Sequence, residues 1–401
     1  MLIAGEASGD WLAADLVRAL RPVLSHGDAG PSADLQPLTS ALEPSFFGAG
    51  GPRMREAGVE LAVDLTQHAV FGFVEVLRRV VEFGRLFRQL LRLALARQPD
   101  VLVLVDYAGF NRRFAAAVRR RAQAGHGPFN NWQPRLVYFV SPQVWASRAG
   151  RAQQLARDVD LLLSIFPFEK AWYARRVPGF RVEFVGHPIV DRYHDLPERV
   201  EPSPVETSLP LVLLLPGSRR QEVRHHLPIL VEAARLVRER QPVKLRMVLP
   251  DPDLADLARR LMPASSDLEL GVGNLSESLR AAALAVASSG TVTLECAFFR
   301  VPTVVIYRTS WPTYWIARRI VQVSHMAMPN LLTRDRVYPE LLQGDATAQN
   351  IAREALDLLA GTARRRSMQQ QLDGVIRSLG GPGACERAAG LIANLLRAGS
   401  P

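Results

Sequence analysis

The segment at the start of the sequence combines glycines with a carboxylate and a hydroxyl group. Residues 5–10 read Gly-Glu-Ala-Ser-Gly-Asp; they follow a short apolar run and precede apolar residues at helical spacing. The glycines permit a tight strand-to-helix turn, Ser8 or Asp10 is expected to cap the helix, and its free amides favour an anionic group. A plain connection is the alternative, and this segment alone does not decide between them.

An aspartate follows another apolar run in the first half of the chain. Residues 101–105 read Val-Leu-Val-Leu-Val, and Asp106 comes directly after them. At the carboxyl end of a parallel strand, a carboxylate can serve as a general base. The alternative is that Asp106 caps the helix predicted after it.

A third candidate segment crowds an aromatic ring and several hydrogen-bond donors into a few positions. After the apolar run 136–140 come Ser141, Pro142, Gln143 and Trp145. Proline fixes a bend, so this segment is unusual for a mere connector. A structural turn anchored by a buried Trp145 remains the alternative.

In the second half, an arginine follows a predicted strand. Residues 211–215 lead into Pro-Gly-Ser and then Arg219. A guanidinium can hold a phosphate through a forked pair of hydrogen bonds, which a lysine does not match. A turn with a surface arginine is the alternative.

Downstream, a helix start carries a second phosphate-binding pattern. Ser289, Gly290 and Thr291 follow an apolar run, and Glu295 lies about one helical turn beyond. Gly290 lets a phosphate approach the first amides, and Glu295 on the same face can accept from a ribose diol. Together with Arg219, this pattern indicates a nucleotide.

The elements that must position these residues alternate between short apolar runs and amphipathic segments, which is typical of parallel α/β folds. We expect two doubly wound, Rossmann-like domains that face a central cleft, residues 1–196 and 211–401, with the last helix able to pack back on the first domain. The proline-rich residues 197–210 are expected to be the linker. Expected strands lie at residues 46–48, 101–105, 136–140, 161–165, 183–185, 211–215, 245–249, 284–287 and 303–307.

Composition narrows the function classes. A chain of 401 residues is longer than a single domain with one hydrophobic core usually is, so two domains are expected. The net charge of +10 suits a phosphate-rich partner or an anionic membrane, whereas the sequence has no nucleic-acid module. The two cysteines match no metal or disulfide pattern, which favours a reducing compartment. We expect neither export nor a spanning helix, and the short first strand suggests that the chain extends upstream.

Two motifs are misleading. Residues 48–53 resemble a dinucleotide fingerprint, but Arg53 replaces its last glycine, so we expect no nicotinamide cofactor. Asp251 and Asp253 form a DxD pattern that helix capping explains at least as well. We therefore expect no metal and no cofactor.

One basic, apolar segment indicates lipid. Residues 70–95 interleave arginines with aromatic and aliphatic side chains, among them Phe71, Phe73, Phe83 and Phe87. A buried helix with arginine edges is one interpretation, and a membrane or acyl-chain surface is the other; we expect the four phenylalanines to contact the membrane. Residues 311–323 have the same ambiguity.

Taken together, the motifs resemble those of the lipid-A-disaccharide synthases, inverting glycosyltransferases with two Rossmann-like domains (GT-B type). The resemblance runs nearly end to end. The stretches that carry it are residues 4–10, 48–54, 72–76, 99–111, 140–145, 166–170, 184–188, 215–219 with Glu222, 289–296, and 329–332 followed by 340–343.

The resemblance implies the substrates: UDP-2,3-diacylglucosamine as donor and 2,3-diacylglucosamine 1-phosphate as acceptor, joined β-1,6 with release of UDP in lipid A and lipopolysaccharide biosynthesis. It also implies a cytoplasmic enzyme bound peripherally to the inner face of the cytoplasmic membrane of a Gram-negative-type bacterium, and it leaves a homodimer open. Rival interpretations are another UDP-sugar transferase or epimerase of this fold, and an inactive lipid-binding protein.

The resemblance also implies residue roles. Asp106 is the expected base, with Glu6 as a possible assistant, and Gly109 stands where many relatives have a second aspartate. The donor-site residues that it implies are Arg219, Glu295, Asn330 and Gln343, and the local pattern adds Ser289, Gly290 and Thr291. From their own segments, Ser8, Gly9, Ser141, Gln143 and Trp145 are expected to line the acceptor site or cleft. A histidine placed like His187, before a proline at a domain edge, is more often structural.

Overall fold

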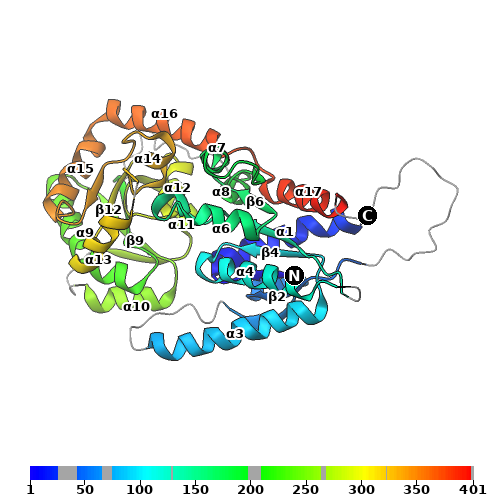
Figure 1. The fold of residues 1–401 in the computed structure, drawn as a ribbon. Helices are drawn as coiled ribbons and strands as arrows, with labels where there is room; N and C mark the ends of the chain where they lie inside the picture. Colours follow the sequence, from blue (N-terminus) through cyan, green and yellow to red (C-terminus); the bar gives the residue numbers. More distant parts are fainter. Residues whose placement is uncertain are drawn as a thin grey trace. The chain divides into compact units, whose positions relative to one another are not determined.

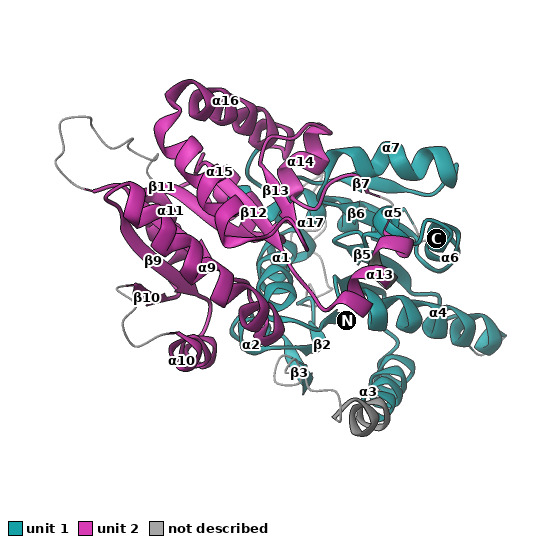
Figure 2. Ribbon diagram, turned by 90° about the vertical axis from the view of Figure 1, so that its left-hand side faces the viewer, with its two compact units in different colours: residues 1–191, 381–401 teal, residues 192–380 magenta. Residues whose placement is uncertain are grey.

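The computed structural model describes residues 1–25, 43–65, 75–127, 130–196, 209–262, 268–321 and 323–398. The chain forms two compact units, one of residues 1–191 with 381–401 and the other of residues 192–380 (Figure 2). Phe71, Phe73 and most of the predicted linker lie outside the described residues.

The first unit is built on a seven-stranded parallel sheet with the order β3-β2-β1-β4-β5-β6-β7. Its central strands are buried along their length, which explains why they are continuous apolar runs rather than alternating patterns. The strands are β1 (Leu2–Ala4), β2 (Phe47–Gly50), β3 (Glu60–Asp64), β4 (Val101–Val105), β5 (Arg135–Phe139), β6 (Leu161–Ser164) and β7 (Val182–Phe184).

Helices connect these strands and pack on the sheet (Figure 1). The C-terminal helix α17 packs against α1, and α4 packs against α3 and α6. The helices of this part of the chain are α1 (Ala7–Ser25), α2 (Pro52–Glu56), α3 (Glu75–Arg97), α4 (Ala108–Gly125), α5 (Val144–Ser147), α6 (Arg151–Asp158), α7 (Pro167–Arg176), α8 (Pro188–Tyr193) and α17 (Ala384–Arg397).

The predicted cap of α1 needs correction. Asp10 lies inside α1 and is buried, and its carboxylate accepts hydrogen bonds from the backbone N–H groups of Gly51 (2.7 Å), Arg53 (3.0 Å) and Met54 (3.1 Å). A carboxylate that accepts from these amides stabilises a helix N-terminus. Asp10 therefore caps α2 and ties it to α1.

The second unit holds a six-stranded parallel sheet with the order β10-β9-β8-β11-β12-β13. Its strands are β8 (Leu211–Leu215), β9 (Lys244–Leu249), β10 (Glu269–Val272), β11 (Ala282–Ser288), β12 (Thr303–Tyr307) and β13 (Glu340–Leu342). Its helices are α9 (Arg220–Arg240), α10 (Pro252–Leu261), α11 (Leu275–Ala281), α12 (Val292–Phe298), α13 (Trp311–Ile320), α14 (Met328–Thr333), α15 (Ala348–Ala360) and α16 (Thr362–Ser378).

Each sheet has a point at which the direction of winding reverses. In the first, the chain winds outward from β1 to β3 and returns on the other side of β1 with β4; in the second, β8 to β10 are followed by β11 on the other side of β8. Loops that leave the carboxyl ends of such strand pairs diverge and leave room for a ligand.

The predicted class of two parallel α/β sheets is confirmed. The DxD pattern is a helix start, because the Asp251 carboxylate accepts from the Leu254 N–H at 2.8 Å and caps α10. Within the described ranges, we find no helix with the length and apolar content needed to span a membrane.

Candidate active site

The predicted base lies at the switch point of the first sheet. Ala4 of β1 is in register with Val105 of β4, so Gly5 and Asp106 leave neighbouring strands side by side. The ring of Tyr107 packs against the backbone of Gly5, where a Cβ atom would clash with it. Glycine at this position therefore lets the two loops approach closely.

The turn that carries Asp106 has an uncommon backbone conformation. Asp106 and Tyr107 both have φ of +48°, which costs free energy for residues other than glycine. The Asp106 carbonyl accepts from the Tyr138 hydroxyl (2.6 Å) and the Asn111 side-chain amide (2.9 Å), which hold it in place. Tyr107 occupies the N-cap position of α4, so the Asp106 carboxylate is not the cap of that helix.

Electrostatics at this turn suit a base. Burial raises the pKa of Asp106, the nearby Glu6 carboxylate raises it further, and a hydrogen bond from the Tyr107 N–H lowers it. A carboxylate with a raised pKa binds a proton more strongly, which improves general-base catalysis while it remains ionised. Glu6 and Ser8 are exposed at the start of α1, whereas Gly9 is buried close to Ala4.

The segment after β5 is held by a buried network that the sequence interpretation missed. The Trp145 indole N–H donates to Glu169 at 2.9 Å, and Ser141 shares a hydrogen bond with the Tyr173 hydroxyl at 3.1 Å. Burial raises the pKa of Glu169 to about 7, although hydrogen bonds from the Trp145 and Ser141 side chains and from the backbone of Ile165 and Phe166 favour its ionised form. Glu169 could have been suspected from its position three residues after Phe166, where a carboxylate commonly closes a helix start.

This network matches the structural alternative for Trp145. Ser141 and Trp145 are both buried, and only the Gln143 side chain among the three predicted residues is exposed. Contact of Gln143 with an acceptor stays a prediction. Ser141 and Trp145 contribute by fixing the backbone that carries it.

The second unit places Arg219 at its own switch point. Leu215 of β8 is in register with Ala287 of β11, so the loops that follow them begin side by side. Gly217 has φ of +122°, which favours glycine, and Glu222 accepts from the Ser218 N–H at 3.1 Å. The Arg219 side chain is 71% exposed and only loosely paired with Glu222 at 3.4 Å, so it can reach an anion.

The loop after β11 contributes the other predicted donor residues. Gly290 and Thr291 are exposed, and the Ser289 hydroxyl donates to the Met326 carbonyl at 2.8 Å. Glu295 is 16% exposed and accepts from the Tyr193 hydroxyl at 2.9 Å. Burial raises the pKa of Glu295, while the Tyr193 hydrogen bond and the Arg192 charge lower it.

Asn330 is buried and used within the protein. Its side-chain amide donates to the Tyr338 carbonyl (2.9 Å) and to Glu340 (2.7 Å), and its oxygen accepts from the Tyr338 N–H. Glu340 also accepts from the N–H groups of Met326 and Ala327. Asn330 therefore shapes the loop beside Ser289, and its direct contact with a donor stays a prediction.

Gln343 and His226 brace the loop after β12. Gln343 pairs with both backbone groups of Thr309, accepting at 3.1 Å and donating at 2.7 Å. The neutral His226 ring lies between the Pro216 carbonyl (2.8 Å) and the Arg308 N–H (2.9 Å), and burial lowers its pKa. His226 thus joins the loops after β8 and β12, a role that no sequence motif indicated.

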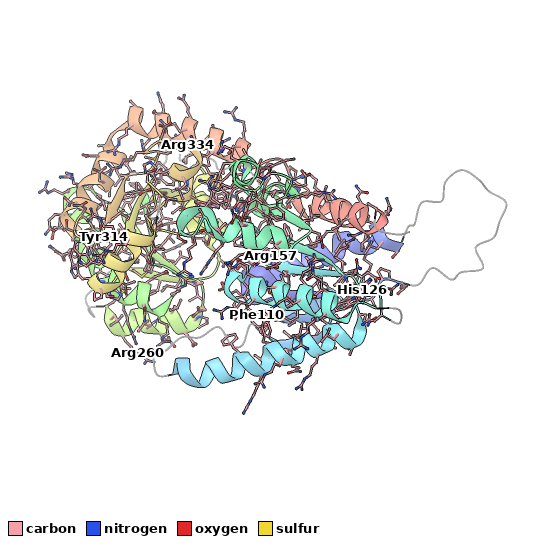
Figure 3. The ribbon with its side chains drawn as sticks, in the orientation of Figure 1. Phe110, His126, Arg157, Arg260, Tyr314 and Arg334 are labelled. Carbon is pink, nitrogen blue, oxygen red and sulfur yellow. The ribbon has the colours of Figure 1, made fainter. Side chains whose placement is uncertain are left out.

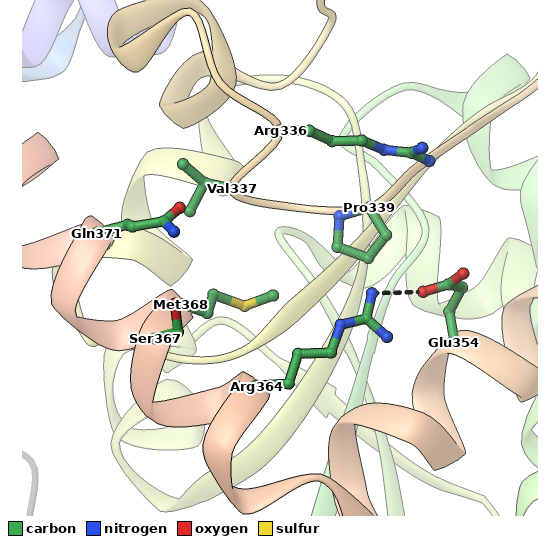
Figure 4. A pocket seen from close by; sticks show the side chains of 8 residues that line it. All are labelled: Arg336, Val337, Pro339, Glu354, Arg364, Ser367, Met368 and Gln371. Atoms are coloured by element: carbon green, nitrogen blue, oxygen red, sulfur yellow. Dashed lines mark hydrogen bonds and ion pairs between the residues drawn. The ribbon is translucent and has the colours of Figure 1, made fainter.

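A pocket of about 290 Å³ opens elsewhere in the second unit, beside β13 and α16 (Figure 4). Arg364 pairs with Glu354 at 2.8 Å at its wall. None of the predicted donor residues lines it, so it is separate from the candidate site. Its lining consists of Arg336, Val337, Pro339, Glu354, Arg364, Ser367, Met368 and Gln371.

Helix α3 shows where the described phenylalanines of the predicted membrane contact lie. The Phe87 ring packs edge-on against the rings of Phe110 and Phe114 in α4, with ring centroids 5.4 and 5.5 Å apart. Phe110 is labelled in Figure 3. Phe83 is half-buried, and Arg85 is exposed. Phe87 is half-buried like Phe83, so its contacts with α4 leave its membrane contact a prediction.

Comparison with known proteins decides the family. The family described as lipid-A-disaccharide synthetase matches residues 1–395. A lipid-A-disaccharide synthase of Geobacter sulfurreducens is 38% identical over 406 residues, which cover 99% of this chain and 97% of the relative. The chain belongs to the lipid-A-disaccharide synthase family. A lipid-A-disaccharide synthase of Myxococcus xanthus is 37% identical over 412 residues, covering 100% and 98% of the two chains.

This membership confirms the predicted resemblance and the enzyme class, a glycosyltransferase that forms the lipid A disaccharide. Solved structures confirm the GT-B type fold. A putative UDP-N-acetylglucosamine 2-epimerase from Listeria monocytogenes has a TM-score of 0.63 at 14% identity and covers 100% of this chain and 96% of its own. The calicheamicin glycosyltransferase CalG4 has a TM-score of 0.56 at 16% identity, with coverage of 100% and 98%.

Proposed function

We propose that the protein transfers the sugar of UDP-2,3-diacylglucosamine to 2,3-diacylglucosamine 1-phosphate, forming a β-1,6 bond and releasing UDP. The observation that supports this proposal is the same in both units: the candidate residues leave the carboxyl ends of the strand pair at which the sheet reverses its winding. The family is one that forms the lipid A disaccharide, and the two candidate sites hold a base and a phosphate-binding arginine for such a transfer.

The proposed step is a single displacement with inversion. The acceptor 6-hydroxyl oxygen bonds to C1 of the donor sugar, the bond from C1 to the UDP oxygen breaks, and the hydroxyl proton passes to Asp106. This mechanism needs one base and no covalent nucleophile. Glu6 acts as the neighbouring charge that keeps Asp106 a stronger base.

The donor is proposed to bind in the second unit. The exposed Arg219 pairs with the diphosphate, whose negative charge grows as UDP leaves. Gly290 and Thr291 offer backbone amides in the adjacent loop, and Glu295 accepts from the ribose. Ser289, Asn330 and Gln343 hold this surface in shape through the hydrogen bonds described above.

Because both proposed substrates carry acyl chains, the enzyme must reach a membrane surface. We propose a peripheral contact through α3, with Phe83 as the described aromatic residue that remains available and Arg85 and Arg88 on lipid phosphates. A cytoplasmic location at the inner face of the membrane follows from this proposal, and a homodimer stays open to test.

The test of the proposed base is Asp106→Asn, which keeps the size of the side chain and removes its basicity. We expect turnover to fall by at least ~10²-fold while UDP binding, measured by calorimetry, is largely kept. Asp100→Asn is the matched control, because Asp100 is exposed at the opposite end of β4. Near-normal turnover of Asp106→Asn would remove Asp106 from the mechanism.

A further inference from the structure

Helix α13 carries the most exposed large apolar side chains in the described part of the chain. Trp311 is 55% exposed and Trp315 is 53% exposed. Residues four apart lie on the same face of a helix, so the two indoles form one surface. Tyr314, labelled in Figure 3, adjoins both rings in edge-on contacts at 5.9 and 6.2 Å.

The aromatic face of α13 is also strongly basic. The Arg318 guanidinium lies over the Trp315 ring at 5.8 Å, and Arg308, Arg318 and Arg319 are all exposed. Along the sequence, no acidic residue occurs between Glu295 and Asp335. The helix therefore presents exposed aromatic rings with positive charges that no neighbouring carboxylate in this stretch offsets.

The base of α13 is held by buried groups. Gln343 pairs with both backbone groups of Thr309, and the His226 ring accepts from the Arg308 N–H. The Ser310 and Thr313 hydroxyls hydrogen-bond at 2.8 Å in the first turn. These contacts fix the segment from which α13 starts, and the two tryptophans follow it directly.

This combination fits one kind of partner. Tryptophan rings prefer the interface between lipid headgroups and acyl chains, and arginines attract the phosphates of anionic lipids. We propose that α13 docks on an anionic lipid bilayer, with Trp311 and Trp315 in the interfacial region and Arg318 and Arg319 on lipid phosphates. The inference rests on the proposed function only in that acylated substrates explain why such a surface is useful.

Vesicle co-sedimentation of the full chain tests the proposal. The probes are vesicles of phosphatidylcholine alone and of phosphatidylcholine with phosphatidylglycerol. We expect stronger binding to the anionic vesicles, weakened by salt. The double variant Trp311→Ser and Trp315→Ser should lower the bound fraction by about tenfold. The double variant Arg318→Gln and Arg319→Gln should weaken the preference for anionic lipid.

The matched control is the double variant Leu261→Ser and Val272→Ser in the same unit. The Leu261 and Val272 side chains are 43% and 40% exposed in the native protein. It should bind vesicles like the native protein, and all variants should keep its thermal unfolding profile. Native-like vesicle binding by the tryptophan variant overturns the proposal.

Activity in detergent separates this inference from the proposed function. If the tryptophan variant loses vesicle binding but keeps its KM for acylated substrates in detergent, α13 is a bilayer surface. A raised KM with unchanged vesicle binding makes it an acyl-chain site and contradicts the proposal. If the native protein makes no disaccharide yet binds vesicles through α13, the proposed function fails and the docking surface stands.

Discussion

At the scale of single residues, the decisive feature is the pair of carboxylates at the first switch point. Asp106 is held by the strained turn after β4, and burial together with Glu6 raises its pKa. A general base works only when ionised, so the rate falls as the pH drops through this pKa. The acid limb of the pH profile should therefore lie above 3.8, the ordinary value for an aspartate.

The variant Glu6→Gln tests the role of the neighbouring charge. Removing the Glu6 charge removes one of the causes that raise the pKa of Asp106, so the acid limb of kcat/KM should move to lower pH. Burial remains, so the limb should stay above 3.8. Glu56→Gln, an exposed carboxylate on α2, is the control and should not move the limb. A limb that stays in place in Glu6→Gln would show that Glu6 does not act through Asp106.

Helix α3 has two described phenylalanines, both half-buried, and they differ in their aromatic neighbours. Phe87 packs on Phe110 and Phe114, so Phe87→Ser should destabilise the first unit by roughly 1–3 kcal/mol through lost aromatic contacts and a cavity. Phe83 is half-buried, and Phe83→Ser should weaken vesicle binding with a smaller effect on stability.

Hydrogen exchange of peptides from α3 and α4 measures the first effect, and co-sedimentation measures the second. Each variant serves as the control for the other. Equal loss of protection in both variants, with vesicle binding unchanged, would contradict a lipid contact at Phe83 and favour an entirely structural helix.

The central strands of both sheets could be predicted because parallel strands buried on both faces are continuous apolar runs. The strands β3, β10 and β13 were not predicted, since β3 and β10 contain no fully buried residue and β13 contains only one, so none of them is a continuous buried apolar run. The cap of α2 was also hidden, because Asp10 is far from Gly51 in sequence and close only in the fold.

The same distinction applies to the site. The positions of Asp106, Arg219 and Gly290 after buried strands were predictable because strand ends and glycine turns are local features, whereas their roles stay predictions. The buried partners were not: Glu169, His226 and Glu340 act through contacts with distant segments. The burial of Asn330 and Gln343 likewise depends on how loops pack, which spacing does not reveal.

The whole molecule belongs to the lipid-A-disaccharide synthase family and carries one proposed site in each of its two units. In each unit the winding of a parallel sheet reverses at one strand pair, and polar side chains follow the carboxyl ends of these two strands. Direct displacement requires both substrates to be bound at once, so neither unit is expected to release UDP from the donor efficiently without the acceptor.

Transfer between the two acylated sugars is tested by one assay of the purified full chain. UDP-2,3-diacylglucosamine and 2,3-diacylglucosamine 1-phosphate are supplied together in detergent, and products are identified by mass spectrometry and NMR. We expect equal amounts of UDP and a β-1,6-linked disaccharide 1-phosphate, with little product from acceptors that lack acyl chains. A sugar epimer without disaccharide, or equal use of non-acylated acceptors, would contradict the proposed transfer.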